Sequence, residues 1–382
     1  MGPTLIFDKS FLQSLNANEL FELDAWFELA CPPVLISEII ADLRTKRKDR
    51  VPIELVRALA AKMQSAYGPE PPAPVSLVRG EFRGYPVPMR GSIPVMPGSR
   101  GVRASKDGKM LMIDMKPQQE MWRLWANGDF TAEEIERAEK WRAEISAVTF
   151  GELRTTWAPF VQDLGNPSTL EEILNGIDAY LGSSENQPAV LNFTASFFDV
   201  NVLERVIAQT AFDLVAKQTG RLPLMRDAFP YSVSAIRVFM AYACMVARGL
   251  HTPRQTQTDH IDLQYLFYAP FCMTFASSDA LHREMFAATT TIASFAWGYD
   301  LKMDLARLAN IRSQMSREDW RAHRMAHGIH PPPSEESLVS RLWSRHMGPP
   351  RPYDPDAGPK TVEEMGPDFL AMLNRVRDEF GT

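Results

Sequence analysis

Short apolar segments that are each followed by an acidic residue restrict most strongly what this chain can fold into. There are three of them: residues 4–7 (TLIF) before Asp8, residues 34–36 (VLI) before Glu38, and residues 273–276 (MTFA) before Asp279. Each has the length of a β-strand, and stretches with helical periodicity separate them. Strands that alternate with helices over a long chain predict a sheet assembled from distant parts of the sequence.

Helices are expected wherever apolar residues recur at helical spacing. The expected helices are residues 10–15, 18–30, 37–43, 52–63, 131–146, 202–217, 232–248 and 262–268, with more from 280 to about 325 and a short one at 367–380. Thr131 with Glu134, and Ser168 with Glu171, have the spacing of capping boxes at helix starts. Ser37 is expected to cap the third of these helices.

Changes in composition divide the chain into four parts. Residues 1–66 and 231–312 contain all three strand candidates, so they are expected to form one sheet domain. Residues 67–230 are expected to be an insertion, with a basic arm rich in proline and glycine (67–110) followed by helices. Residues 313–382 are expected to be a helical, proline-rich C-terminal extension. The expected fold class is therefore α/β, a parallel sheet flanked by helices with a large, mainly helical insertion.

The overall composition is that of a globular protein. Of 382 residues, 45% are hydrophobic and 23% are charged, and the formal net charge is −6. A negative chain is not covered by a nucleic-acid-binding surface, although a local basic patch is compatible with it. The most apolar long segment, residues 231–250, contains Arg237 and Arg248. These charges favour a buried helix over a membrane span, so no membrane partner is expected.

The cysteines and the N-terminus bear on location. Cys31, Cys244 and Cys272 all lie among apolar residues, and none belongs to a CxxC pair. They predict neither a disulfide framework nor a zinc site. The N-terminus lacks the pattern of a signal peptide. We therefore expect a cytoplasmic protein.

The acidic residues that follow the strand candidates are the main candidates for a functional site. Parallel strands bring their carboxyl ends to one edge of the sheet, where α/β proteins place their sites. Asp8, Glu38 and Asp279 are expected at that edge, together with Asp259 or Asp262 from a later helix start. Converging carboxylates repel one another unless a cation neutralises them or some are protonated. An all-oxygen cluster suits Mg²⁺ or Mn²⁺, which promote phosphoryl transfer.

Three segments also resemble a known family, the PIN-domain nucleases, and in particular its larger bacterial PIN-like members. The segments are LIFDKSFLQSL, PPVLISEIIADL and DHIDLQYLFYAPFCMTFASSDALHREM, within residues 1–66 and 232–310. The family has an Asp ending the first strand, a Glu opening a helix, an Asp at a later helix start and an Asp after a further strand. Asp8, Glu38, Asp262 and Asp279 match these in turn, and Asp259 is close enough to share or replace the third.

The resemblance implies a function and a set of site residues. It implies a metal-dependent nuclease acting on RNA rather than DNA, with Asp8, Glu38, Asp262 and Asp279 as catalytic ligands of Mg²⁺ or Mn²⁺. Ser278 corresponds to a small polar residue beside the last Asp. Arg44, Lys46, Arg47 and Lys48 follow the Glu38 helix and are candidates for contacts to nucleic acid. A regulatory protein partner is a further implication of the family.

Simpler interpretations remain open at this stage. Each of the four acids could merely cap or open its helix. The chain could also be a catalytically inactive PIN-like scaffold in a nucleic-acid-processing or defence complex. A phosphatase of the DxDxT type is disfavoured, because Ser10 stands where that motif needs a second acid.

Three further groups of residues invite functional interpretations. The segment 79–109 has seven basic and two acidic residues, with Phe82 and Tyr85 interleaved, so it could bind unpaired bases; a mobile basic loop is the simpler expectation. Trp122, Trp125 and Trp141 are expected in the core. His323, His327 and His330 have helical spacing but no carboxylate or cysteine beside them, so a helix end at the surface is expected rather than a metal site.

Overall fold

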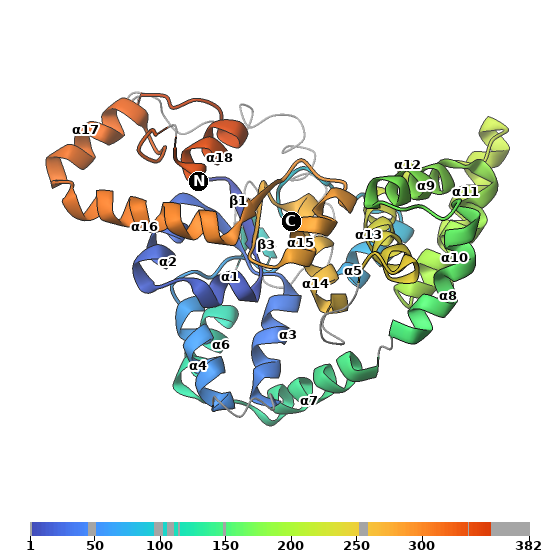
Figure 1. Cartoon of the computed structure of the whole chain (residues 1–382), viewed down its shortest axis with the longest axis horizontal. Coiled ribbons are helices and arrows are strands. Elements are labelled where there is room, and N and C mark those ends of the chain that lie inside the picture. The colour runs from blue at the N-terminus through green and yellow to red at the C-terminus, as the bar shows by residue number, and fades with distance from the viewer. Residues whose placement is uncertain are drawn as a thin grey trace.

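A four-stranded parallel sheet lies at the centre of the molecule (Figure 1). The computed structural model describes residues 2–44, 51–94, 102–104, 111–113, 115–147, 150–251, 259–334 and 336–352. The strand order is β2-β1-β5-β6, and every neighbouring pair is parallel. The strands are β1 (Thr4–Phe7), β2 (Glu28–Ala30), β5 (Thr274–Ser277) and β6 (Ser294–Trp297). The α/β class and the parallel sheet expected from the sequence are confirmed.

The sheet joins the two ends of the chain through its central pair of strands. Ile6 of β1 lies beside Ala30 of β2 and Phe275 of β5. Leu5, Ile6 and Phe7 are fully buried, as is Phe275. Parallel strands covered on both faces require such continuous apolar sequences, which explains why residues 4–7 do not alternate with polar ones.

Helices near the sheet come from both ends of the chain. They are α1 (Lys9–Ser14), α2 (Ala17–Trp26), α3 (Pro33–Ala41), α4 (Pro52–Met63), α14 (Asp259–Leu266), α15 (Ala280–Met285) and α16 (Gly298–Gln314), with single 3-10 turns at Asp42–Arg44, Ala269–Phe271 and Phe286–Ala288. Helix α2 packs on α16, and α14 packs on α15 and α3. Side-chain caps start several of these helices, as Asn16 and Glu19 do for α2.

The segment between the two halves of the sheet is mainly helical. It contains α5 (Pro74–Phe82), α6 (Lys116–Asn127), α7 (Ala132–Ala147), α8 (Phe150–Asp163), α9 (Leu170–Gly182), α10 (Gln187–Phe197), α11 (Val202–Thr219) and α12 (Met225–Ala228), a 3-10 turn at Ser184–Asn186, and an antiparallel pair of strands, β3 (Val102–Ala104) and β4 (Leu111–Ile113). Figure 1 shows α8 to α12 gathered around α13 on one side of the molecule.

Helix α13 (Pro230–Arg248) connects this helical group to the sheet region. It packs against α5, α8 and α9 from the intervening segment and against α14 and α15 beside the sheet. By length and composition alone it could span a membrane, but 78% of its most apolar window is buried inside the protein. Its apolar character is thus accounted for by packing within the fold.

A buried carboxylate fastens α5 to the start of α13. Glu81 accepts hydrogen bonds from Tyr231 N (2.9 Å), Ser232 N (2.8 Å) and Ser232 Oγ (2.6 Å), so it caps a helix 150 residues away. Burial raises the pKa of Glu81 to about 7 in spite of these donors. Arg83 adds an ion pair to Glu204 on α11. The expected mobile basic loop is therefore structured at this end, and Phe82 is buried rather than free to stack on bases.

The described residues of the C-terminal part, up to 352, form two helices on the opposite side of the sheet from α8 to α12 (Figure 1). They are α17 (Arg317–His327) and α18 (Leu338–Met347). Trp343 of α18 is buried and its indole N–H donates to Trp26 O at 2.8 Å, which ties α18 to the end of α2. The predicted helix at 367–380 lies outside the described residues.

Several sequence-based predictions of local structure are wrong. Residues 34–36 are not a strand; they lie in α3, which begins at Pro33 and not at Ser37. Proline suits the first helical turn, where its missing N–H is not needed, so Pro32-Pro33 starts this helix instead of separating two elements. The second strand is Glu28–Ala30, which the helical pattern of residues 18–30 concealed.

Other differences concern elements whose pattern is short. Strand β6 was not expected, and neither were α5 and α18. The predicted capping box at Ser168 is displaced by one residue, because Thr169 caps α9 and Glu172 reaches back to Ser168. The box of Thr131 and Glu134 is confirmed, as is the burial of Trp122 and Trp125. The division into four parts stays a prediction.

Candidate functional site

Asp8 lies where β1 ends and α1 begins, at the carboxyl edge of the sheet. Its Oδ1 accepts from Phe11 N at 2.8 Å, and its Oδ2 accepts from Ser10 Oγ at 2.7 Å. The predicted helix cap is therefore confirmed. A cap does not by itself explain why this carboxylate is almost completely buried, with 3% of its surface exposed. A buried charge needs further partners.

Those partners come from β5 and α15. Ser277 Oγ donates to Asp8 Oδ2 at 2.7 Å, and His282 Nδ1 lies 3.4 Å from the same oxygen. Burial raises the pKa of the Asp8 carboxyl, but His282, Ser277 and Phe11 N outweigh this and lower it below its usual value. Asp8 is thus held as an anion in the interior.

Hydrogen-bond accounting shows that His282 is a cation here. Its Nε2 lies 2.8 Å from the carbonyl oxygen of Asp262 and therefore carries a proton. Ser277 Oγ uses its only proton on Asp8, so the 2.7 Å contact between Ser277 Oγ and His282 Nδ1 needs the proton on the ring. Burial lowers the pKa of His282, but Asp8, Asp262 and Asp279 outweigh burial and raise it to about 9.

Glu38 reaches the same edge from α3. Its Oε2 accepts from Tyr265 Oη at 2.7 Å, and Lys9 Nζ lies 3.5 Å from its Oε1. Lys9 also pairs with Asp42 at 2.8 Å. Glu38 sits within α3 rather than at its start, so the interpretation of this residue as a first-turn acid is wrong.

Asp262 and Asp279 complete the group. Asp279 caps α15, with Leu281 N donating to its Oδ1 at 2.7 Å. Asp262 lies in the first turn of α14. Burial raises the pKa of Asp262 well above its usual value, and the negative charges of Glu38, Asp279 and Asp8 raise it further, against the opposing charge of His282. The four predicted acids therefore interact within one region.

Asp259 occupies a different position. It accepts from Tyr242 Oη at 3.1 Å and pairs with His251 Nε2 at 2.8 Å. The hydrogen bond to Asp259 raises the pKa of His251 in spite of partial burial. Asp262 shares its electrostatic environment with Asp8 and Glu38. Asp279 also raises the pKa of His251, so the contacts of Asp259 adjoin this group.

The predicted nucleic-acid contacts receive little structural definition. Arg44 forms an exposed ion pair with Glu139 of α7. Lys46, Arg47 and Lys48 lie outside the described residues. Ser278 is half-buried beside the start of α16, where a Cβ on Gly298 would lie 2.2 Å from Ser278 Oγ. Glycine at position 298 thus permits the close approach of α16 to the residue that precedes Asp279.

The four acids offer the oxygen ligands that a hard divalent cation prefers, but they are not arranged as a coordination sphere. All four acids offer oxygen, and their mutual repulsion would be relieved by a cation. Within the described ranges, however, no three His, Cys, Asp or Glu side chains are arranged to hold one ion. Both oxygens of Asp8 already accept hydrogen bonds from the protein. The metal site stays a prediction that requires these side chains to draw closer.

Sequence reasoning missed the residues that support the acids. Ser277, His282, Tyr265 and Lys9 all contact one of the four carboxylates. The spacing of His282 three residues after Asp279 places both on one turn of α15, and this was an available signal. Tyr265 has the same relation to Asp262 on α14.

Comparison with known proteins yields no relative: no family model, no curated protein and no solved structure matches the chain. The three cysteines are buried and unpaired. The resemblance described above therefore rests on the three segments quoted for it.

Proposed function

We propose that the protein is a metal-dependent nuclease of the PIN-like class, acting on RNA in preference to DNA. The observation that carries the proposal is the convergence of Asp8, Glu38, Asp262 and Asp279 from four separate segments, with three of these charges raising the pKa of the fourth. Structural acids are usually paired singly with a base, whereas perturbed clusters are typical of functional sites. The preference for RNA comes from the family resemblance alone.

Each residue has a role that its environment supports. Asp8, held as an anion, is positioned by Ser277 and His282. Glu38 is oriented by Tyr265. Asp262, whose pKa is raised, is the carboxylate best suited to hold or transfer a proton. Bound Mg²⁺ or Mn²⁺ would supply the positive charge that stabilises a phosphoryl transition state.

The helix starts at this edge favour the same substrate chemistry. Helices α1, α15 and α16 all begin directly after a strand of the sheet or its following loop. Helix N-termini carry partial positive charge and attract phosphate groups. This arrangement supports a phosphate ester as the substrate.

The test is cleavage of labelled single-stranded RNA, structured RNA and single-stranded DNA with Mn²⁺, Mg²⁺ or EDTA. The variants are Asp279→Asn and Asp262→Asn. Asn is as good a helix cap as Asp, so Asp279→Asn removes charge while keeping α15 capped. Asp213→Asn on α11, an exposed acid remote from the sheet, is the matched control.

We expect cation-dependent cleavage of RNA by the wild type and by Asp213→Asn, with a loss of roughly 100-fold or more in each site variant. Cleavage that survives in both site variants would show that the site is elsewhere. Absence of cleavage by the wild type under every condition would favour the second candidate, a scaffold that keeps the fold and binds a protein partner through its helical segments.

A further inference from the structure

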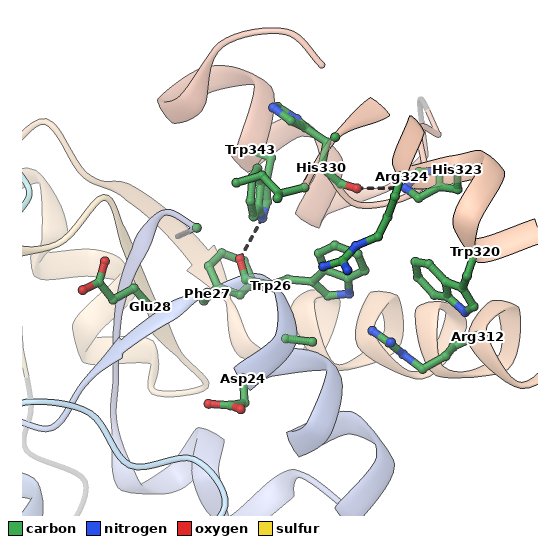
Figure 2. A pocket seen from close by; sticks show the side chains of 14 residues that line it. Asp24, Trp26, Phe27, Glu28, Arg312, Trp320, His323, Arg324, His330 and Trp343 are labelled. Carbon is green, nitrogen blue, oxygen red and sulfur yellow. Dashed lines mark hydrogen bonds between the residues drawn. The ribbon is translucent and has the colours of Figure 1, made fainter. Parts of the chain in front are cut away.

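A second candidate site lies at the opposite edge of the sheet from Asp8 and Asp279. A pocket of about 690 Å³ is formed between the end of α2, the start of β2, and helices α16, α17 and α18. Its volume is in the range that holds a drug-sized ligand. Figure 2 shows the side chains around it, which come from both ends of the chain.

Aromatic rings form much of the pocket wall. Trp26 and Trp320 are stacked with ring centroids 6.3 Å apart, and Trp343 meets Trp26 edge to face at 6.4 Å. His330 packs on Trp343 with centroids 4.8 Å apart. Trp26 and Trp343 are buried, whereas Trp320 is half-buried, so Trp320 offers the accessible aromatic surface on which a planar ring can stack.

One arginine is part of this wall. The Arg312 guanidinium lies 4.7 Å from the Trp320 ring centroid and 5.6 Å from that of Trp26. It is also paired with buried Glu22, which accepts a hydrogen bond from Trp26 Nε1 at 2.8 Å. Glu22 thus fixes both Trp26 and Arg312, so the wall is ordered before any ligand arrives.

A second arginine is placed differently. Arg324 is exposed on α17 and extends toward the pocket in Figure 2. No ion pair to it occurs in the part of the chain that the structure describes. An unpaired guanidinium beside aromatic walls is suited to a phosphate or carboxylate on the same ligand. Asp24 and Glu28 line the other side and can accept from N–H groups of a ring.

We infer that this pocket binds a nucleotide, with its base stacked against Trp320, its phosphate at Arg324 and the donor edge of the base toward Asp24 and Glu28. Guanine is the expected base, because its N1–H and N2–H₂ groups are adjacent donors for a carboxylate. Adenine and cytosine instead have a hydrogen-bond acceptor beside their amino group, and this acceptor repels a carboxylate. The inference is independent of the proposed nuclease activity.

The experiment is calorimetric titration of the full-length protein with guanosine monophosphate (GMP), guanosine, adenosine monophosphate (AMP) and inorganic phosphate, in EDTA. EDTA suppresses cation-dependent cleavage, so binding is read without catalysis. We expect GMP to bind most tightly. A ligand with two anchor points should exceed guanosine and phosphate by about tenfold or more.

Two variants of α17 locate the phosphate. Arg324→Ala should weaken the binding of GMP by roughly tenfold and leave the binding of guanosine unchanged. Arg321→Ala, also exposed on α17 but outside the pocket lining, is the matched control and should bind GMP as the wild type does. Equal weakening by both variants, or none by Arg324→Ala, would overturn the inference.

A third variant tests stacking. Trp320→Ala should weaken both GMP and guanosine, whereas Trp320→Phe should restore most of the binding because it keeps an aromatic face. Circular dichroism checks that each variant is folded. No saturable binding of GMP up to millimolar concentration, or AMP binding as tightly as GMP, would contradict the stated ligand.

A further titration decides whether the nucleotide is free or is the end of an RNA strand. A short RNA with a 5′-phosphorylated guanosine carries the same base and phosphate as GMP. If it binds about tenfold more tightly than GMP, the pocket serves the end of a strand; if it binds equally or more weakly, the pocket serves the free nucleotide. Both results support the site, and they separate its two sources.

Discussion

The two edges of the central sheet differ in chemistry although one set of strands and helices builds both. The carboxyl edge collects Asp8, Asp262 and Asp279, while the amino edge collects Trp26 and Arg312. In a parallel sheet each strand is followed by a helix that runs back, so helix N-termini meet at one edge and C-termini at the other. Acids are favoured at the first and bases at the second.

The helix that follows β6 shows the contrast within one element. Helix α16 begins at Gly298 beside Ser278 and ends near Arg312, which pairs with Glu22. Its acidic residue in the first turn is Asp300, and its basic residue in the last turn is Arg312. The difference teaches that backbone direction alone predisposes one edge to collect carboxylates and phosphates, and leaves the other to be defined by side chains.

The largest effect should follow from breaking the buried network at the carboxyl edge. Asp8→Asn leaves His282 buried without its anionic partner, and the cost of such a broken pair is about 3 to 5 kcal/mol of unfolding free energy. Denaturant titration measures it. Asp213→Asn should change nothing measurable. If Asp8→Asn unfolds at the wild-type midpoint, the network does not stabilise this edge.

The second-largest effect should be the pH dependence of stability that His282 causes. Its pKa is raised to about 9 from 6.5, so its contribution is fully present below pH 6.5 and is lost as pH rises to 9. The loss should be about 3 kcal/mol. His282→Asn should lack this decline. Glu81, whose pKa is raised from 4.5 to about 7, lowers stability mainly between pH 4.5 and 7, so it overlaps only the lower end of this window, and its effect should persist in the variant. A decline of equal size in His282→Asn would refute the assignment.

Crowding at the start of α16 should give the third effect. In Gly298→Ala the added Cβ would meet Ser278 Oγ at 2.2 Å and Phe11 Cδ2 at 2.9 Å. Such overpacking costs about 1 to 3 kcal/mol. Gly151→Ala is the control, because nothing lies within 4 Å of its Cβ and alanine favours a helix. Thermal unfolding compares the two, and equal melting temperatures would mean that α16 can shift freely.

The smallest effect should come from His330 at the amino edge, and its pH dependence should have the opposite sign to that of His282. Burial lowers the pKa of His330, with a further contribution from His327. The folded state thus resists protonation of His330, so this group reduces stability as pH falls below 6.5. His330→Phe should be less sensitive to acid than the wild type. The same sign of pH effect at both edges would remove the contrast between them.

The resemblance of residues 1–66 and 232–310 to one family pointed to four acids that the structure brings into one region, but not to the residues that support them. Asp8 and Asp279 were recognisable because each follows a short apolar strand. Their partners His282 and Ser277 were not assigned, because the three-residue spacing of His282 from Asp279 does not by itself show that this histidine is buried. Strand β6 was missed because its sequence, SFAW, precedes a strong helical pattern without a break.

The sequence by itself determined the class of the fold and the edge at which the acids gather. Apolar segments of strand length, helical periodicity and the carboxylates that follow β1 and β5 suffice for that, because these are local properties that act within a few residues.

Only the tertiary structure decided the charge state of the site and the existence of the pocket. His282 is protonated because Asp8 and Asp262 reach it from other segments, while the neighbouring Ser277 donates to Asp8. The pocket exists because Trp343 packs on Trp26 across 317 positions of the chain. Such long-range contacts are set by how helices pack on the sheet, and no local pattern encodes them.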